Sequence, residues 1–258
     1  MFRFTLICFS VFFLTSAGMD ENKPKPVIYL IGDSTVKNGS GKGEGGLWGW
    51  GDFLYTQIDT NRISIINFAR GGRSSRTFIS EGLWDKVLAQ LEPGDYVIMQ
   101  FGHNDGGPVN DNFRARGSIK GTGMETEEID NILTKKHEIV HTFGWYLRKY
   151  ITDTKSKGAI PIVCSLVPRN MWTNGKVNRS SEDYAKWAEA AAAEKAFYIN
   201  LNEMIALKYE SLGEDVVKTK YFRTDHTHTL KDGAILNASM VAEGVKSLKK
   251  CKLKKYLK

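Results

Sequence analysis

Short, almost uninterrupted apolar runs recur along the chain and alternate with stretches that have the spacing of amphipathic helices. Runs of this length without polar alternation are typical of strands buried on both faces, as in parallel sheets. Strands that alternate with helices predict a doubly wound α/β domain, with helices on both faces of the sheet. The runs lie at 27–31, 63–67, 95–101, 159–167 and 197–200.

Helical spacing fills the gaps between these runs. The longest such stretch, 127–157, predicts one long helix or two. The segment from Ser180 to Asp183 has a capping pattern, which predicts a helix after Ser180. A last helix is predicted after the loop 225–228, with the lysines of the tail on its solvent side. No internal repeat or proline-rich linker interrupts this order, so we predict one folded domain.

Polar clusters follow the first three predicted strands, at 32–34, 72–74 and 103–105. Right-handed crossovers place the carboxyl ends of parallel strands on one edge of a sheet. Ligands bind along that edge in open α/β sheets. We therefore expect the three clusters to meet in one crevice.

The N-terminus has the pattern of a secretory signal peptide. Arg3 precedes an apolar stretch from Leu6 to Leu14, and the small residues Ala17 and Gly18 follow. This stretch is shorter than the roughly 20 residues that span a bilayer. We predict a signal peptide at 1–17, a linker at 18–25 and the domain at 26–258. The mature protein is then secreted or periplasmic, with no membrane attachment after cleavage.

The formal net charge of +7 is unevenly distributed, because seven lysines lie in the tail 246–258. Without this tail and Arg3, basic and acidic residues nearly balance. A near-neutral body is poorly suited to nucleic acid, so we predict no nucleic-acid partner, although weak attraction of the tail to an acidic polymer stays open. Beyond the signal peptide only Cys164 and Cys251 remain, which do not make a disulfide framework. Cys164 lies in an apolar run and is predicted to be buried.

Ser34 follows the first strand, and a serine at such a turn is either a helix N-cap or a nucleophile with a base in reach. The segment Asp225-His226-Thr227-His228 supplies a candidate base near the C-terminus. An aspartate three residues before a histidine fits on one tight turn and orients the imidazole. Asp225 is then the partner of His228. His226 is the competing base, and a metal site of these three side chains is a third interpretation.

Acyl transfer also needs hydrogen-bond donors for the oxyanion that forms during attack. The candidates are the backbone amides of Ser34 and Gly72 and the side-chain amide of Asn104. Gly72 has no Cβ, so its backbone can approach a substrate closely. Asn104 offers neutral donors that leave the base undisturbed. The alternative roles are a tight turn for Gly72 and an Asx turn for Asn104.

These blocks in this order resemble the SGNH (GDSL-type) hydrolase superfamily: Gly32-Asp33-Ser34, Gly72, Gly102-His103-Asn104-Asp105 and Asp225-His226-Thr227-His228. The longer strings at 72–76, 101–107 and 225–229 are similar to the rhamnogalacturonan acetylesterase branch, carbohydrate esterase family 12. Thr35 stands where the family name has leucine, which removes no catalytic group.

The resemblance implies a flavodoxin-like, three-layer α/β/α fold with a five-stranded parallel sheet. It implies Ser34 as the nucleophile, His228 as the base and Asp225 as its orienting carboxylate. The oxyanion hole is implied to consist of Ser34, Gly72 and Asn104. The resemblance implies no metal and no cofactor, and it implies removal of O-acetyl groups from pectic polysaccharide. Another acetylated polysaccharide, such as xylan, is the alternative substrate.

Two competing hypotheses come from other motifs. His137-Glu138-Ile139-Val140-His141 matches H-E-x-x-H, which on the predicted helix would place two histidines for zinc, with Glu138 as base. The longer metzincin pattern needs a histidine where Leu147 stands, which disfavours a zinc protease. A non-catalytic carbohydrate-binding protein is the third class, with sugar rings stacked on tryptophans in or near loops (Trp48, Trp50 and Trp172).

Overall fold

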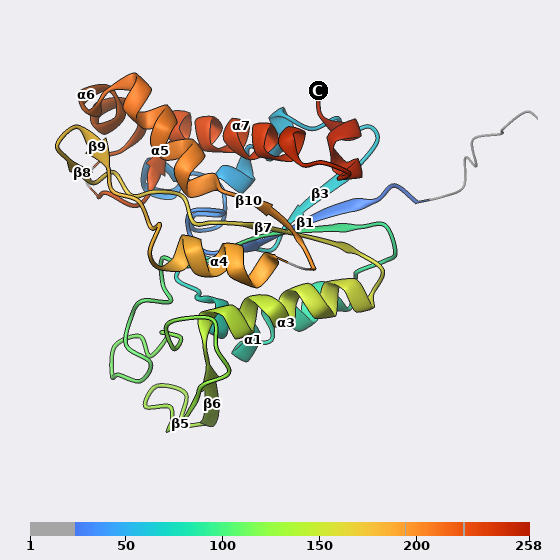
Figure 1. Cartoon of the computed structure of the whole chain (residues 1–258), viewed down its shortest axis with the longest axis vertical. Helices are drawn as coiled ribbons and strands as arrows, with labels where there is room; N and C mark the ends of the chain where they lie inside the picture. Colours follow the sequence, from blue (N-terminus) through green and yellow to red (C-terminus); the bar gives the residue numbers. More distant parts are fainter. Residues whose placement is uncertain (1–23, 194, 224) are drawn as a thin grey trace, which may run out of the picture.

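A computed structural model describes residues 24–258 except 194 and 224 (Figure 1). The predicted signal peptide, 1–17, lies outside the described residues, as does the predicted linker up to residue 23. All five apolar runs form strands: β1 (Val27–Gly32), β3 (Ser64–Asn67), β4 (Tyr96–Gln100), β7 (Ile160–Cys164) and β10 (Phe197–Ile199).

These strands form one five-stranded sheet in the order β10-β7-β4-β1-β3. Every neighbouring pair is parallel, and β1 lies between the central strand β4 and the edge strand β3. This order is that of flavodoxin-like sheets, in which the chain reverses direction across the sheet after its first two strands. The predicted fold class is therefore confirmed.

Alternate residues of the strands enter two separate cores. Ile28, Leu30 and Ile98 face one side, where they pack with α5 (Leu201–Leu212) and α7 (Lys231–Ser247). Tyr29, Ile31 and Met99 face the other. On that side lie α1 (Ser75–Ser80), α2 (Leu83–Leu88), α3 (Phe143–Ser156) and α4 (Tyr184–Ala192). Side chains alternate across a strand, so this pattern produces three layers, which Figure 1 shows with α5 and α7 above the sheet and α1, α3 and α4 below.

Three small two-stranded antiparallel sheets lie outside the central sheet. They are β2 (Leu47–Trp48) with β11 (Thr229–Leu230), β5 (Thr126–Asp130) with β6 (His137–His141), and β8 (Trp172–Thr173) with β9 (Lys176–Val177). The short helices are η1 (Glu44–Gly46), η2 (Trp50–Asp52), η3 (Leu54–Thr56), α6 (Glu214–Val216), η4 (Val217–Tyr221) and η5 (Lys252–Tyr256). Within residues 24–258, no described helix is long and apolar enough to cross a membrane.

The helix predicted over 127–157 is wrong in its first half. The segment forms the β5–β6 hairpin, and only the second half is helical, as α3. The H-E-x-x-H string therefore lies on β6 instead of a helix. Residues four apart on a strand are about 13 Å apart. His137 and His141 are thus too distant to share a metal ion.

Each member of that string has another partner. Glu138 accepts from Arg76 Nε at 3.0 Å, and the Arg76 side chain is buried. His141 stacks on Trp145 with ring centroids 3.7 Å apart. His137 lies near Asp130, with Nδ1 3.1 Å from the carboxylate. The motif is part of the packing of the hairpin.

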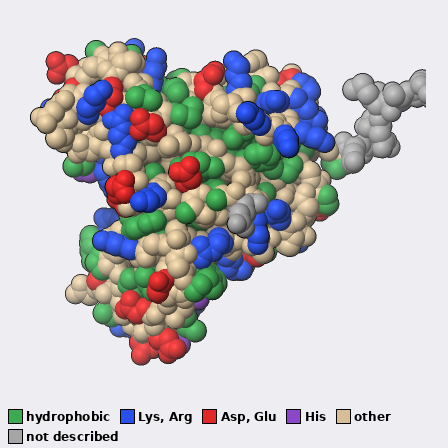
Figure 2. Space-filling view, in the orientation of Figure 1, with side chains coloured by type: hydrophobic (Ala, Val, Ile, Leu, Met, Phe, Trp, Pro, Cys, Tyr) green, Lys and Arg blue, Asp and Glu red, His purple; other side chains and the backbone are tan. Residues whose placement is uncertain are grey.

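Two further boundaries differ from the sequence prediction. Helix α4 begins at Tyr184, because the Asp183 carboxylate accepts from the Tyr184 amide and caps it, so Ser180 lies ahead of the helix. The last helix ends at Ser247, and the lysine-rich tail forms a turn and η5 instead of lying along a helix. Figure 2 shows Lys and Arg side chains gathered over this C-terminal segment. Cys164 and Cys251 are both buried free thiols.

Candidate active site

Ser34 lies in the turn that follows β1, at the carboxyl edge of the sheet. The preceding Asp33 is fully buried, and its Oδ1 accepts from the backbone amide and the hydroxyl of Thr35, at 2.8 and 2.7 Å. Its carbonyl accepts from the amides of Val36 and Lys37. A Cβ at Gly32 would lie 2.5 Å from the Gln100 carbonyl oxygen, so the tight exit from β1 requires glycine. The turn therefore holds the Ser34 side chain in a fixed place.

His228 is held by a turn just before β11. One oxygen of Asp225, Oδ1, accepts from the backbone amides of Thr227 and His228, at 2.6 and 2.7 Å. The other oxygen, Oδ2, lies 2.9 Å from Nδ1 of the His228 ring. One carboxylate thus fixes both the loop and the imidazole that the loop carries.

The structure brings Ser34 and His228 together although 194 residues separate them in sequence. The Ser34 hydroxyl lies 2.9 Å from Nε2 of His228. Partial burial acts to raise the pKa of Asp225, but the backbone and ring N–H of His228 and the amide of Thr227 outweigh it and lower that pKa. Asp225 is therefore a carboxylate at neutral pH, so Nδ1 of His228 donates to it and Nε2 is free to accept from Ser34.

The candidate oxyanion donors lie around this hydroxyl. Gly72 has φ of +78°, a left-handed conformation that favours glycine, and the neighbouring Gly71 lies next to Ser34. Asn104 is 7% exposed and donates one amide N–H to the Arg73 carbonyl at 2.9 Å, which fixes the plane of its side chain. Its other N–H is unused by the described residues. Ser34, Gly72 and Asn104 line one pocket with His228.

A buried pair that the sequence analysis did not single out supports this arrangement. The His103 ring lies with Nδ1 3.1 Å from Asp33 and Nε2 3.0 Å from the Val167 carbonyl oxygen. A carbonyl and a carboxylate only accept, so this geometry suits an imidazolium. Burial alone would raise the pKa of Asp33, but the charge and hydrogen bond of His103 and the hydrogen bonds of Thr35 lower it. The pair joins the residue before Ser34 to the residue before Asn104.

The pocket around Ser34, which we call the inner pocket, has a volume of about 320 Å³. Besides the residues named above, its wall contains Arg114, Arg116 and Arg169. Among the described residues, none of these three arginines forms an ion pair with a carboxylate. Arg116 donates to the Gly72 carbonyl at 3.0 Å, and Arg169 donates to Thr227. The inner pocket is therefore cationic.

The alternative sites from the sequence analysis do not form. Nδ1 of His226 contacts Thr227 and Arg169, and the imidazole that contacts Ser34 is that of His228. Trp50 is fully buried and donates to Gln100, while Trp48 and Trp172 pack against the core. In the part of the chain that the structure describes, no group of three or more His, Cys, Asp or Glu side chains is arranged to hold a metal ion.

A three-layer α/β fold fits a carboxylic ester hydrolase when a serine, a histidine and an aspartate are hydrogen-bonded in a row at the carboxyl edge of its sheet. The chain belongs to the GDSL-like lipase/acylhydrolase family, whose model matches residues 30–230. It is 33% identical over 234 residues to a rhamnogalacturonan acetylesterase of Emericella nidulans, covering 90% of this chain and 89% of that protein. It is 34% identical to a probable rhamnogalacturonan acetylesterase of Bacillus subtilis, covering 86% of this chain and 93% of that protein.

Solved structures show the same fold. The Bacillus subtilis protein YxiM superposes with a TM-score of 0.67 at 25% identity, over 86% of this chain and 56% of that one. An acetylxylan esterase from Geobacillus stearothermophilus superposes with a TM-score of 0.54 at 16% identity, over 85% of this chain and 93% of that one. At this low identity, the second likeness concerns the fold alone.

Proposed function

We propose that this protein removes O-acetyl groups from pectic polysaccharide by a serine mechanism. The observation that carries the mechanism is the continuous hydrogen-bonded chain from Ser34 through His228 to Asp225. The 2.9 Å between the Ser34 hydroxyl and Nε2 of His228 is within the reach that proton transfer from serine to histidine requires.

In the proposed reaction, the Ser34 oxygen attacks the acetyl carbonyl carbon as Nε2 of His228 takes its proton. The negative charge that forms on the carbonyl oxygen is met by the amides of Ser34 and Gly72 and by Asn104. The intermediate collapses to an acetyl-serine, and His228 gives its proton to the departing sugar oxygen. Water activated by His228 then attacks the acetyl-serine and releases acetate. Asp225 stabilises the imidazolium in both steps.

The cationic wall of the inner pocket favours an acidic polymer over a neutral one. Burial and the neighbouring Arg114 charge lower the pKa of Arg116, so these two guanidinium groups repel one another. A uronate carboxylate close to the ester relieves this repulsion and binds arginine well. Acetylated xylan as a neutral chain offers no such group. The two relatives above are named as rhamnogalacturonan acetylesterases, which also favours a pectic substrate over xylan.

The test is acetate release from a panel of acetylated pectins and xylans, with an aryl acetate as a small substrate. Ser34→Ala is expected to lose at least about 10³-fold in kcat on every substrate. The wild-type protein is expected to have its highest kcat/KM on acetylated pectin. Unchanged turnover in the Ser34→Ala protein contradicts the mechanism, and a preference for xylan contradicts the substrate.

We further propose that the protein is exported, because residues 1–17 have the signal-peptide pattern described above. A polymeric substrate outside the cell requires such export. The expected result is a mature protein in the periplasm or medium whose mass corresponds to cleavage after Ala17 or Gly18. A full-length protein retained in the cytosol contradicts this proposal.

A further inference from the structure

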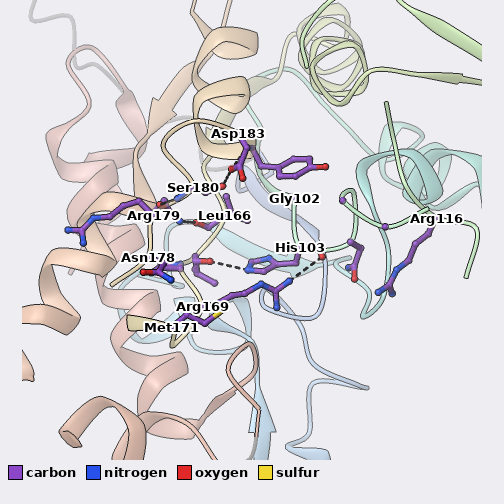
Figure 3. Close-up of a pocket in the computed structure, with 17 residues that line it drawn as sticks. Gly102, His103, Arg116, Leu166, Arg169, Met171, Asn178, Arg179, Ser180 and Asp183 are labelled. Carbon is purple, nitrogen blue, oxygen red and sulfur yellow. Dashed lines mark hydrogen bonds between the residues drawn. The ribbon is translucent and has the colours of Figure 1, made fainter. Parts of the chain in front are cut away.

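A second cavity of about 480 Å³ opens beside the inner pocket, and we call it the outer pocket. The two cavities share His103, Asn104, Arg116 and Arg169 in their walls. Figure 3 shows Arg116 and Asn178 on opposite sides of the outer pocket, with His103 between them. The outer pocket is therefore adjacent to the inner pocket that contains Ser34.

The wall of the outer pocket is divided by polarity. One part is apolar and consists of Leu166, Val167, Pro168 and Met171. Another part is polar and consists of Asn178, Arg179, Ser180, Asp183, Tyr184 and Asn202. A pyranose ring has an apolar face of C–H groups and a rim of hydroxyl groups, so it complements a wall of this kind.

Most of the polar groups in this wall already have partners. Arg179 is paired with Glu203 and Glu210. Asp183 caps α4 and accepts from Ser180. These side chains shape the pocket but have little hydrogen-bonding capacity left for a ligand.

In the polar part of this wall, Tyr184 and Asn178 retain unused donors. Tyr184 is 8% exposed, yet its hydroxyl has no hydrogen-bond partner among the described residues. Burial, and then the charges of Asp105 and Asp183, raise its pKa, so the hydroxyl stays protonated. The hydroxyl lies next to Gly106, another residue of the outer-pocket wall, since a Cβ at Gly106 would lie 3.4 Å from it. The amide oxygen of Asn178 accepts from the Thr173 hydroxyl, and its side-chain N–H groups have no partner in the described chain.

A buried hydroxyl without a partner costs free energy, and a bound hydroxyl or ring oxygen removes that cost. We propose that the outer pocket is a subsite for a sugar unit next to the acetylated one, bound by the Tyr184 hydroxyl and the Asn178 amide. This inference rests on the proposed action on a polysaccharide. The sugar unit lies with its C–H face on Met171 and Leu166, and the shared wall at Arg116 and Arg169 separates it from the acetylated unit. Occupancy of this subsite makes longer substrates bind better than short ones.

The test compares aryl acetate with acetylated pectic oligosaccharides of one to four sugar units. In the wild-type protein, kcat/KM is expected to rise when a unit is added that reaches the outer pocket. Tyr184→Phe removes only the unpartnered hydroxyl and keeps the ring packing against Phe143 and Trp187. Tyr184→Phe and Asn178→Ala are each expected to raise KM for the longer substrates about 3- to 10-fold, with kcat unchanged. Hydrolysis of aryl acetate by both variants is expected to equal that of the wild type.

Two matched substitutions serve as controls. Tyr29→Phe removes a tyrosine hydroxyl that donates to the Gln90 carbonyl elsewhere, and Asn61→Ala truncates an exposed loop residue. Both are expected to keep the wild-type length dependence. If Tyr184→Phe and Asn178→Ala also keep it while the oligosaccharides are deacetylated, the subsite is wrong and the proposed function stands. If the wild-type protein releases no acetate from any oligosaccharide yet cleaves aryl acetate through Ser34, the polysaccharide function and the subsite both fail.

Discussion

At the scale of single residues, Asp225 determines which ring nitrogen of His228 carries a proton. Its carboxylate lies 2.9 Å from Nδ1, so the N–H is on that nitrogen and Nε2 accepts from Ser34. Asp225→Asn presents an amide N–H to Nδ1 and favours the other tautomer, in which Nε2 cannot accept. We expect kcat on aryl acetate to fall on the order of 10⁴-fold, as in serine proteases, with little change in KM. An equal kcat in this variant contradicts the assigned tautomer.

Asp105 makes stability depend on pH in a defined direction. Burial, offset in part by hydrogen bonds from Ser75 and Ser118, raises its pKa from 3.8 to about 6. Between these two pH values the unfolded chain loses a proton that the folded protein keeps, so stability from this group is present at low pH and is lost as the pH rises to about 6. The wild type should therefore lose about 2–3 kcal/mol relative to Asp105→Asn between pH 4 and pH 7.

Denaturant unfolding at several pH values measures this difference. Asp85→Asn, which changes an exposed carboxylate, provides the baseline. A difference between wild type and Asp105→Asn that stays constant across this range contradicts the raised pKa.

The residues most easily found from sequence are those adjacent to strand ends. Ser34, Gly72 and Asn104 each come after a strand of the parallel sheet, so parallel topology alone places them on one edge. The pairing of His103 with Asp33 was not predicted. It depends on the His103 ring lying between Asp33 and the Val167 carbonyl, and only the folded structure brings these groups together. The arginines of the inner pocket were not predicted either, because only folding brings them to the pocket. Arg114 and Arg116 lie in the long loop between β4 and β5, where the sequence has neither helical nor strand spacing.

At the scale of elements, Arg76 on α1 holds that long loop in place. Its guanidinium donates to the carbonyls of Val109, Ala115 and Gly117 and to Glu138 on β6. Arg76→Lys keeps the charge but cannot reach these acceptors together. We expect a loss of about 2–4 kcal/mol in unfolding free energy, because buried acceptors are left unpaired.

The same substitution should also loosen the segment that carries Arg114 and Arg116. The kcat/KM for acetylated pectin is then expected to fall more than that for aryl acetate, whose small acetyl group needs no arginine. Arg62→Lys, at an exposed arginine that donates to the Lys255 carbonyl, is the control and should change neither measurement. Equal losses on both substrates would mean that the loop does not position the arginines.

The β5–β6 hairpin shows where sequence periodicity fails at this scale. Each of its strands has one buried residue, Ile129 in β5 and Val140 in β6. With one buried position per strand, the sequence does not alternate between apolar and polar residues as a strand usually does. Its charged residues and scattered apolar residues instead have the spacing of an exposed helix. The available signal was turn chemistry: the Asn131 side chain accepts from the amides of Leu133 and Thr134.

At the scale of the whole molecule, the lysine-rich tail and the cationic inner pocket lie far apart. The tail packs near the amino ends of the strands, since the Tyr256 carbonyl accepts from Asp59 just before β3. The inner pocket lies at the carboxyl ends, on the opposite edge of the sheet. Figure 1 shows the C-terminus at the upper right and the β8–β9 hairpin, next to the outer pocket, at the left. Buried Leu253 and Tyr256 anchor the tail to the core.

This separation predicts which charges govern activity on an acidic polymer. Coulombic attraction to a carboxylate weakens as salt shortens the Debye length to about 8 Å at 0.15 M. Raising salt from about 0.02 to 0.5 M should therefore lower kcat/KM for acetylated pectin severalfold and leave that for aryl acetate unaffected.

Arg114→Gln should flatten this salt dependence, because Arg114 lines the inner pocket. Replacing the exposed Lys252 and Lys254 by Gln should leave it unchanged, because both lie at the far edge. If the tail variant loses the salt dependence and Arg114→Gln keeps it, the polymer is attracted by the tail, and the arginines of the inner pocket do not recognise its carboxylates.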